Sequence, residues 1–88
     1  MRATAVSHVT PHLLRVVDLA NEAEKGVNVS WHVGAAVAKT LSELGQQYNG
    51  RELLAAYIEG LDNAAGQAAK GRTEYVHALQ AAAAAARR

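Results

Sequence analysis

The chain has 88 residues, with nine Lys and Arg against eight Asp and Glu, for a formal net charge of +1. This length fits one small domain, and the scattered charges argue against a nucleic-acid-binding surface. The absence of cysteine excludes a disulfide framework, a thiol nucleophile and a Cys-based zinc site. Because no apolar stretch resembles a signal peptide or reaches transmembrane length, we expect no membrane association. The protein is expected to be cytoplasmic, or secreted without a cleaved signal peptide.

Alanine dominates the apolar composition, with twenty alanines against nineteen Leu, Ile and Val. An alanine side chain buries little area, so a core built from it depends on close approach of backbones. A second chain could supply the missing burial. We therefore expect the partner to be another copy of this chain or a related helical protein.

The first predicted arm covers residues 10–48 and follows a flexible N-terminus at 1–9. Thr10 suits a helix N-cap and Pro11 the first helical position. Uncharged residues recur at alternating steps of four and three, as on the packed face of a helix. This first seam consists of Val9, Leu13, Val16, Ala20, Ala23, Val27, Ser30, Gly34, Val37, Leu41, Leu44 and Tyr48.

Residues 26–30, with the sequence GVNVS, interrupt this arm with poor helix formers. Gly26 suits a helix C-cap, and Ser30 could cap a new helix that begins at Trp31. The pattern favours three helices, at about 10–25, 30–48 and 51–86. The alternative of two long arms, with only a kink at this point, stays open.

Asn49-Gly50 is the strongest turn signal in the chain and precedes a second arm at 51–86. We predict an all-α fold, a single domain over 1–88 built as an antiparallel helical hairpin with a turn at 49–50. The three glycines of the second arm, Gly60, Gly66 and Gly71, either admit a neighbouring helix or soften the arm locally. The second seam consists of Leu54, Ile58, Leu61, Ala65, Ala68, Arg72, Tyr75, Leu79, Ala82 and Ala86, with Arg72 its only charge.

No residue pattern predicts catalysis. His8 and His12 have the i, i+4 spacing of a helical metal pair, but the predicted helix start at Thr10-Pro11 lies between them. The sequence has no nucleophile elbow and no Gly-rich phosphate loop. We predict no enzyme activity, no metal, no cofactor and no small-molecule substrate. His32 and His77 are interpreted as partly exposed polar residues.

The large side chains on and beside the two seams are the candidates for a protein interface, because aromatic residues anchor interfaces disproportionately. Trp31, the only tryptophan, either packs in the core or contacts a partner, and both alternatives stay open. The predicted interface residues are Trp31, Leu41, Leu44, Tyr48, Leu54, Ile58, Leu61 and Tyr75.

Two stretches suggest a family. The run Val9-Thr10-Pro11-His12-Leu13-Leu14 and the later run LGQQYNGRELLAAYIEGLDNAAGQAAKG are similar to parts of the small Esp-type secretion-associated proteins. With its length and alanine content, the chain resembles the Trp-x-Gly and Esp-type helical-hairpin proteins of type VII (ESX) secretion in actinobacteria. In place of Trp-x-Gly the chain has Trp31-His32-Val33-Gly34, and Tyr48 and Glu52 alone match the family's Tyr-x-x-x-Asp/Glu spacing. The resemblance implies a secreted helical protein that associates with a related chain.

From these patterns we predict a non-enzymatic helix–helix association protein that forms a homodimer or a heterodimer. Its most specific form is a small protein of type VII secretion. The alternative is an intracellular regulatory or adaptor module of the phage or plasmid type, which binds another protein.

Overall fold

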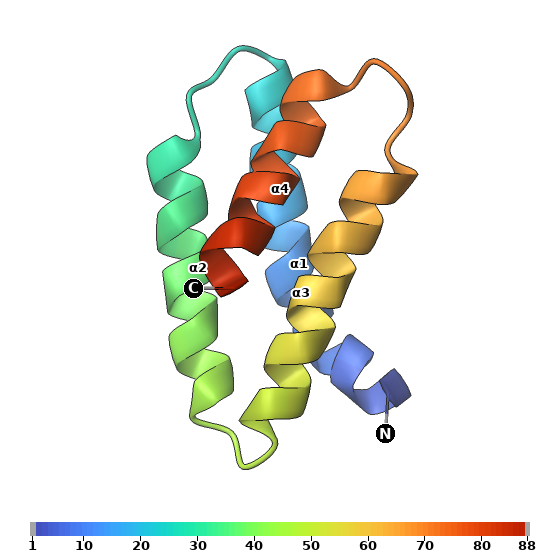
Figure 1. Cartoon of the computed structure of the whole chain (residues 1–88). Coiled ribbons are helices and arrows are strands. Elements are labelled where there is room, and N and C mark those ends of the chain that lie inside the picture. The colour runs from blue at the N-terminus through green and yellow to red at the C-terminus, as the bar shows by residue number, and fades with distance from the viewer. Residues whose placement is uncertain (1, 88) are drawn as a thin grey trace.

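The computed structural model describes residues 2–87, with side chains from residue 5 onward, and over that range its regular secondary structure is all α-helix. The helices are α1 (Arg2–Glu24), α2 (Ser30–Gly45), α3 (Gly50–Gln67) and α4 (Thr73–Arg87) (Figure 1). The predicted all-α class is confirmed. Within residues 2–87, no helix has both the length and the apolar character that crossing a bilayer requires.

The four helices form a bundle in which every helix contacts the other three. Residues 25–29 and 68–72 form two connections at one end of the bundle, and residues 46–49 form the third connection at the opposite end (Figure 1). A bundle of this kind encloses its own apolar core. The predicted hairpin of two or three helices differs from the structure in its second arm, which is broken between α3 and α4, whereas the break in the first arm is the one that the sequence favoured.

α1 begins earlier than expected. The sequence predicted a helix start at Thr10-Pro11 after a flexible segment, but α1 continues from Arg2 through Pro11. A proline inside a helix removes one backbone hydrogen bond and bends the axis. Figure 1 shows the dark blue start of α1 turned away from its paler remainder. Burial of Ala5 and Val9 stabilises these first turns, and the Thr10 hydroxyl donates a hydrogen bond of 2.7 Å to the Val6 carbonyl.

The connection between α1 and α2 has the predicted break and the predicted glycine cap. Gly26 has φ of 92°, the left-handed conformation that glycine adopts without a Cβ clash. Its N–H donates to the Ala23 carbonyl, and the Val27 N–H donates to the Glu22 carbonyl, which is the Schellman pattern. The Asn28 side-chain oxygen then accepts a hydrogen bond of 3.1 Å from the first amide of α2, that of Ser30.

The second arm was predicted as one helix over 51–86, and this prediction is wrong. α3 ends at Gln67, where Ala68 takes an extended conformation with ψ of 144°, and α4 begins at Thr73. Gly71 has φ of 94°, so the chain reverses at a position that requires glycine. The alanines around this connection have high helix propensity, and the tertiary fold overrides it.

The connection between α2 and α3 lies where Asn49-Gly50 indicated a turn, but Gly50 is the first residue of α3. Its φ is not positive, so a left-handed turn is not the reason for a glycine here. A Cβ at Gly50 would lie 2.8 Å from the Leu44 carbonyl oxygen. The residue is therefore glycine because the ends of α2 and α3 meet closely at this point.

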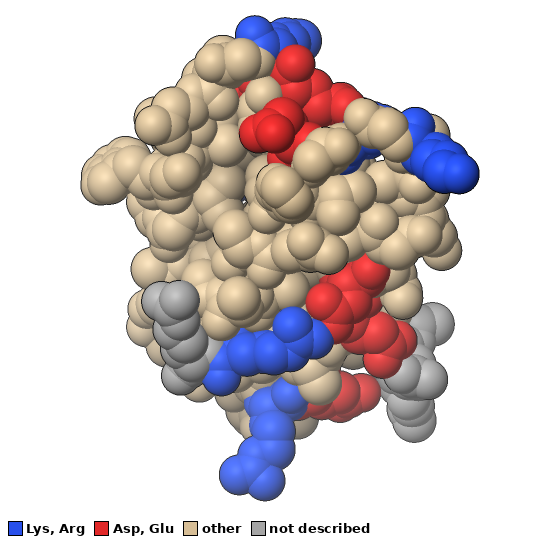
Figure 2. Space-filling view, turned by 45° about the horizontal axis from the view of Figure 1, so that its top comes forward, with Lys and Arg blue, Asp and Glu red and all other residues tan. Residues whose placement is uncertain are grey.

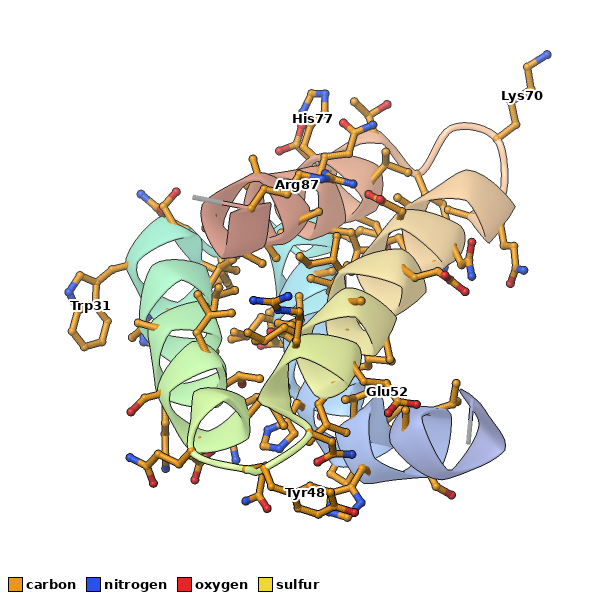
Figure 3. The ribbon with its side chains drawn as sticks, turned by 60° about the horizontal axis from the view of Figure 1, so that its bottom comes forward. Trp31, Tyr48, Glu52, Lys70, His77 and Arg87 are labelled. Carbon is orange, nitrogen blue, oxygen red and sulfur yellow. The ribbon has the colours of Figure 1, made fainter. Side chains whose placement is uncertain are left out.

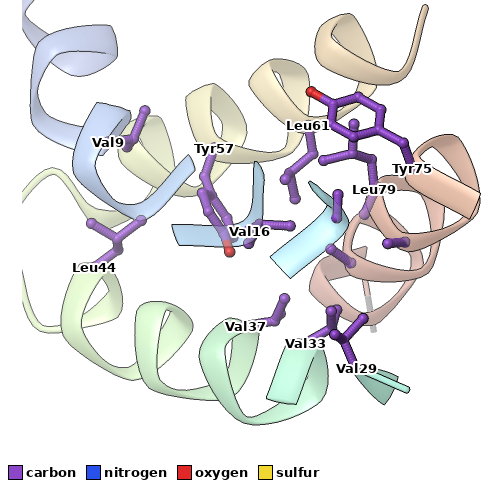
Figure 4. Packing of buried hydrophobic residues seen from close by; sticks show 14 of the residues in the cluster. Val9, Val16, Val29, Val33, Val37, Leu44, Tyr57, Leu61, Tyr75 and Leu79 are labelled. Carbon is purple, nitrogen blue, oxygen red and sulfur yellow. The ribbon is translucent and has the colours of Figure 1, made fainter. Parts of the chain in front are cut away.

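The core lies between all four helices (Figure 4). In α3, Leu53 and Tyr57 are buried in place of the predicted Leu54 and Ile58, one residue away, whereas Leu61 of the predicted seam is buried. The largest fully buried side chains are Tyr57, Leu53, Leu61, Leu79, Val9, Val16, Val37 and Thr40.

Of the two alternatives left open for the three glycines, close approach of a second helix occurs at Gly60. A Cβ there would lie 2.6 Å from Cδ1 of Leu13, so α1 packs directly on the α3 backbone. A Cβ at Gly66 would meet no atom within 4 Å. The alanine-rich end of α4 remains helical to Arg87, whose guanidinium pairs with Asp62 of α3.

Candidate interaction site

One helix face of the bundle is exposed and carries no charge. On α2, residues at spacings of three and four share a face. We call this exposed set the α2 face; it consists of Trp31, Gly34, Ala35, Ala38 and Ser42. The only Lys, Arg, Asp or Glu residues of α2 are Lys39 and Glu43, and both lie outside this set. The face therefore offers a helix surface that another helix can approach without desolvating a charge.

Trp31 stands at the start of this face, one residue into α2. It is 77% exposed and points away from the bundle (Figure 3). The His32 ring meets it edge-on, with 5.4 Å between the ring centroids and 87° between the ring planes. The alternative that Trp31 packs in the core is wrong, because Val29 and Val33 occupy the inward positions of this turn. An indole with this exposure is available to a partner.

The other predicted interface residues do not share a surface with Trp31. Leu44, Leu61 and Tyr75 are at most 8% exposed, because they pack in the core of the single chain. Leu41, Leu54 and Ile58 are half-buried. Tyr48 is fully exposed, but it lies in the connection between α2 and α3, far along the bundle from Trp31 (Figure 3).

A groove lies beside the α2 face, between the start of α2, the α1–α2 connection and α4. Its floor is small and apolar, and two glutamates and a histidine supply its titratable groups. The lining residues are Ala23, Glu24, Gly26, Val27, Asn28, Val29, Ser30, Val33, Gly34, Glu74, His77, Ala78, Ala81 and Ala85. Sequence reasoning missed this groove because it brings together residues more than fifty positions apart.

Arg72, the charge that interrupts the second predicted seam, fixes this end of the bundle. Its Nε and Nη2 donate hydrogen bonds of 3.0 and 2.6 Å to the two carboxylate oxygens of Glu24. Nη2 also donates to Asn21 at 2.9 Å, and the guanidinium carbon lies 3.8 Å from the centre of the Tyr75 ring. These hydrogen bonds lower the pKa of Glu24 below its ordinary value. Arg72 thus ties the α3–α4 connection to the end of α1.

A second polar group lies inside the bundle. The buried Tyr57 hydroxyl has no hydrogen-bond partner among the described residues. Burial raises the pKa of Tyr57, and the nearby Thr40 hydroxyl and Arg15 guanidinium oppose that rise, although Thr40 does not reach hydrogen-bond geometry. Thr40 Oγ1 lies 3.4 Å from Nδ1 of His12.

His8 and His12 share α1, contrary to the predicted helix start between them. His8 is exposed, whereas His12 is half-buried, with Nδ1 4.0 Å from Glu43 Oε1. The part of the chain from residue 5 to residue 87 contains no cluster of three or more His, Asp or Glu arranged to hold a metal ion.

The space-filling view separates the charged side chains from an uncharged area between them. In Figure 2, acidic and basic side chains gather at the top of this side and in a band lower down.

Comparison with protein-family models, curated proteins and solved structures finds no match for this chain.

Proposed function

We propose that this chain is a non-enzymatic association protein whose α2 face packs against a helix of another chain, as a homodimer or as a heterodimer with a related helical protein. The observation that carries the proposal is Trp31, 77% exposed at the head of a face without charge. Exposing an indole to water is unfavourable, and burying one removes about 150–250 Å² of surface from solvent.

The internal packing supports the same proposal. The largest core side chains are fully buried within one chain, so the bundle does not need a partner to complete its core. Partner binding therefore falls on the surface that is left, which is apolar at α2. The proposed interface is therefore the α2 face and not the buried residues Leu44, Leu61 and Tyr75 that were predicted from the sequence. Trp31 belongs to both sets.

Type VII secretion is the more specific form of this proposal. Trp31 is the second residue of α2, just after the α1–α2 connection at 25–29. In the Trp-x-Gly proteins that this chain resembles, the tryptophan also marks a connection between helices. The chain has Gly34 one position later than the motif does. The regulatory or adaptor alternative uses the same face with an unrelated partner.

Association can be followed through Trp31 itself, because it is the only tryptophan. We expect light scattering to give a mass above the 9.3 kDa of one chain, and dilution to shift the Trp31 emission towards that of a solvent-exposed indole. Trp31→Ser should lower the mass to that of one chain with circular dichroism unchanged. Tyr48→Ser, at the other end of the bundle, is the matched control and should leave the mass of the oligomer unchanged.

A single-chain mass at every concentration, with an emission spectrum independent of concentration, would contradict self-association. A related helical protein would then be tested as partner, with Trp31 emission again the readout. An oligomer that persists in Trp31→Ser would show that the α2 face is not the contact.

A further inference from the structure

The α2 face is self-complementary about Ala38. In an antiparallel pair of α2 helices related by a twofold axis at Ala38, each residue lies opposite the residue equally far beyond Ala38. Gly34 then lies opposite Ser42 of the second copy, and Ala35 lies opposite Leu41 of the second copy. Each of these pairs includes at least one small residue. Small residues at a contact let two helix axes approach to about 8 Å, the lower end of the usual range.

The same register places the largest side chain of the face opposite the smallest. Trp31 lies seven residues before Ala38 and Gly45 lies seven residues after it, about 10 Å along the helix in each direction. Gly45 is exposed, and a Cβ there would meet no atom within 4 Å, so the chain leaves open space at this position. The indole of one copy can therefore lie over Gly45 of the other, at both ends of the contact.

Burial of the indoles supplies part of the area that a stable dimer needs. Two buried indoles would remove about 300–500 Å² from solvent, a substantial share of the about 1,200 Å² that the smallest stable interfaces bury. The indole and the apolar helix face are the part of the exposed surface whose burial is most favourable.

We propose that the partner of the α2 face is a second copy of this chain, bound antiparallel with Ala38 on the twofold axis and each Trp31 over Gly45 of the other copy. This inference rests on the proposed function and adds to it the identity of the partner and the register. The contact is isologous, so it closes at two copies. It also leaves Lys39 and Glu43 at the flanks, in water.

Engineered cysteines test the register, because the chain has no cysteine of its own. A disulfide requires two Cα atoms about 4.4–6.8 Å apart. The twofold axis brings a residue that close to the same residue of the second copy only at Ala38. Ala38→Cys should therefore form a disulfide-linked dimer on mild oxidation, with a yield about tenfold above that of an exposed control. Ala55→Cys, on the exposed side of α3, is that control.

Two further variants fix the direction. In the antiparallel register, position 34 lies about 12 Å along the axis from position 34 of the second copy, too far for a disulfide. Gly34→Cys alone and Ser42→Cys alone should each remain uncrosslinked, whereas their mixture should give the linked heterodimer. A linked dimer from Gly34→Cys alone would indicate parallel helices and overturn the inference.

Failure of this inference is distinct from failure of the proposed function. If the native chain dimerises and Trp31→Ser abolishes the dimer, but Ala38→Cys crosslinks no better than Ala55→Cys, the register is wrong and the association face stands. If the native chain has the mass of one chain throughout, a second copy is not the partner. Circular dichroism and the mass under reducing conditions show that each cysteine variant keeps the fold and the dimer.

Discussion

The guanidinium of Arg72 holds the carboxylate of Glu24 through two hydrogen bonds, across forty-eight positions of sequence. This pair joins the α3–α4 connection to the end of α1, and Asn21 and the Tyr75 ring hold the same guanidinium in place. Both partners remain about one-third exposed. The pair therefore acts as an anchor at the surface of the bundle, and its contribution depends on the charge of Glu24.

Acidification should weaken this anchor. The Arg72 hydrogen bonds lower the pKa of Glu24 in the folded chain, so the unfolded chain binds its proton at higher pH. The stabilisation is complete above the ordinary carboxyl pKa of 4.5 and disappears as pH falls through the lowered value. Urea unfolding at neutral and acid pH should show a smaller loss on acidification for Glu24→Gln than for the native chain. Glu22→Gln, which affects an exposed pair with Lys25, should keep the native loss.

Two adjacent leucines test the register of α3. Leu53 is 1% exposed, whereas Leu54 is only half-buried at the edge of the core. Leu53→Ala should cost about 2–5 kcal/mol of unfolding free energy, a large part of the roughly 4–13 kcal/mol expected for 88 residues. Leu54→Ala should cost distinctly less in the same denaturant titration. The reverse order would favour the seam that was predicted from the sequence.

Gly50 and Gly66 should respond oppositely to alanine. At Gly50 the new Cβ would lie 2.8 Å from the Leu44 carbonyl oxygen, a backbone atom that cannot rotate away, so we expect a loss of about 1–3 kcal/mol. At Gly66 the Cβ meets no atom within 4 Å, and the higher helix propensity of alanine should add about 0.5–1 kcal/mol. Thermal or urea unfolding of the two variants measures both effects. Equal responses would contradict the close contact between α2 and α3.

Tyr57→Phe tests the unpartnered hydroxyl in the core. Removing a buried hydroxyl that makes no hydrogen bond should leave the unfolding free energy unchanged or raise it by about 1 kcal/mol. The alkaline limb of the stability curve offers a second readout. Because burial raises the pKa of Tyr57 in the folded state, ionisation above about pH 10 favours the unfolded state. The resulting loss of unfolding free energy at alkaline pH should be smaller in the variant than in the chain with Tyr57. A destabilised Tyr57→Phe would instead indicate a hydrogen bond, to Thr40 or to a buried water.

Local signals predicted the local structure of this chain. The positive φ of Gly26, the break before Trp31 and the position of the turn near Asn49 depend on residues close in sequence, which a reader of the sequence can weigh. The end of α3 at Gln67 could not be predicted in this way. Gly71 is the local signal nearest this break, but the surrounding alanines favour helix, and the pairing of Arg72 with Glu24 that holds the reversal spans forty-eight positions.

The candidate site was only partly predictable for a related reason. Trp31 was identified from its residue type, but its exposure depends on Val33 and Val29 turning inward, a choice made by the packing of α1 and α4 against α2. Pro11 gives the opposite lesson, because a residue that suits a helix start lies inside a helix when buried neighbours such as Val9 stabilise the turns before it.

The alanines buried between α4 and the rest of the bundle have a thermodynamic consequence. Ala78, Ala82 and Ala83 fill core positions that leucine occupies in many bundles, so unfolding uncovers less apolar surface per residue. The heat capacity of unfolding should then fall below the usual value of about 12–15 cal/mol/K per residue. The urea m-value should be low as well. A small heat capacity flattens the curve of stability against temperature. The stability of this protein should therefore change little between cold and warm conditions.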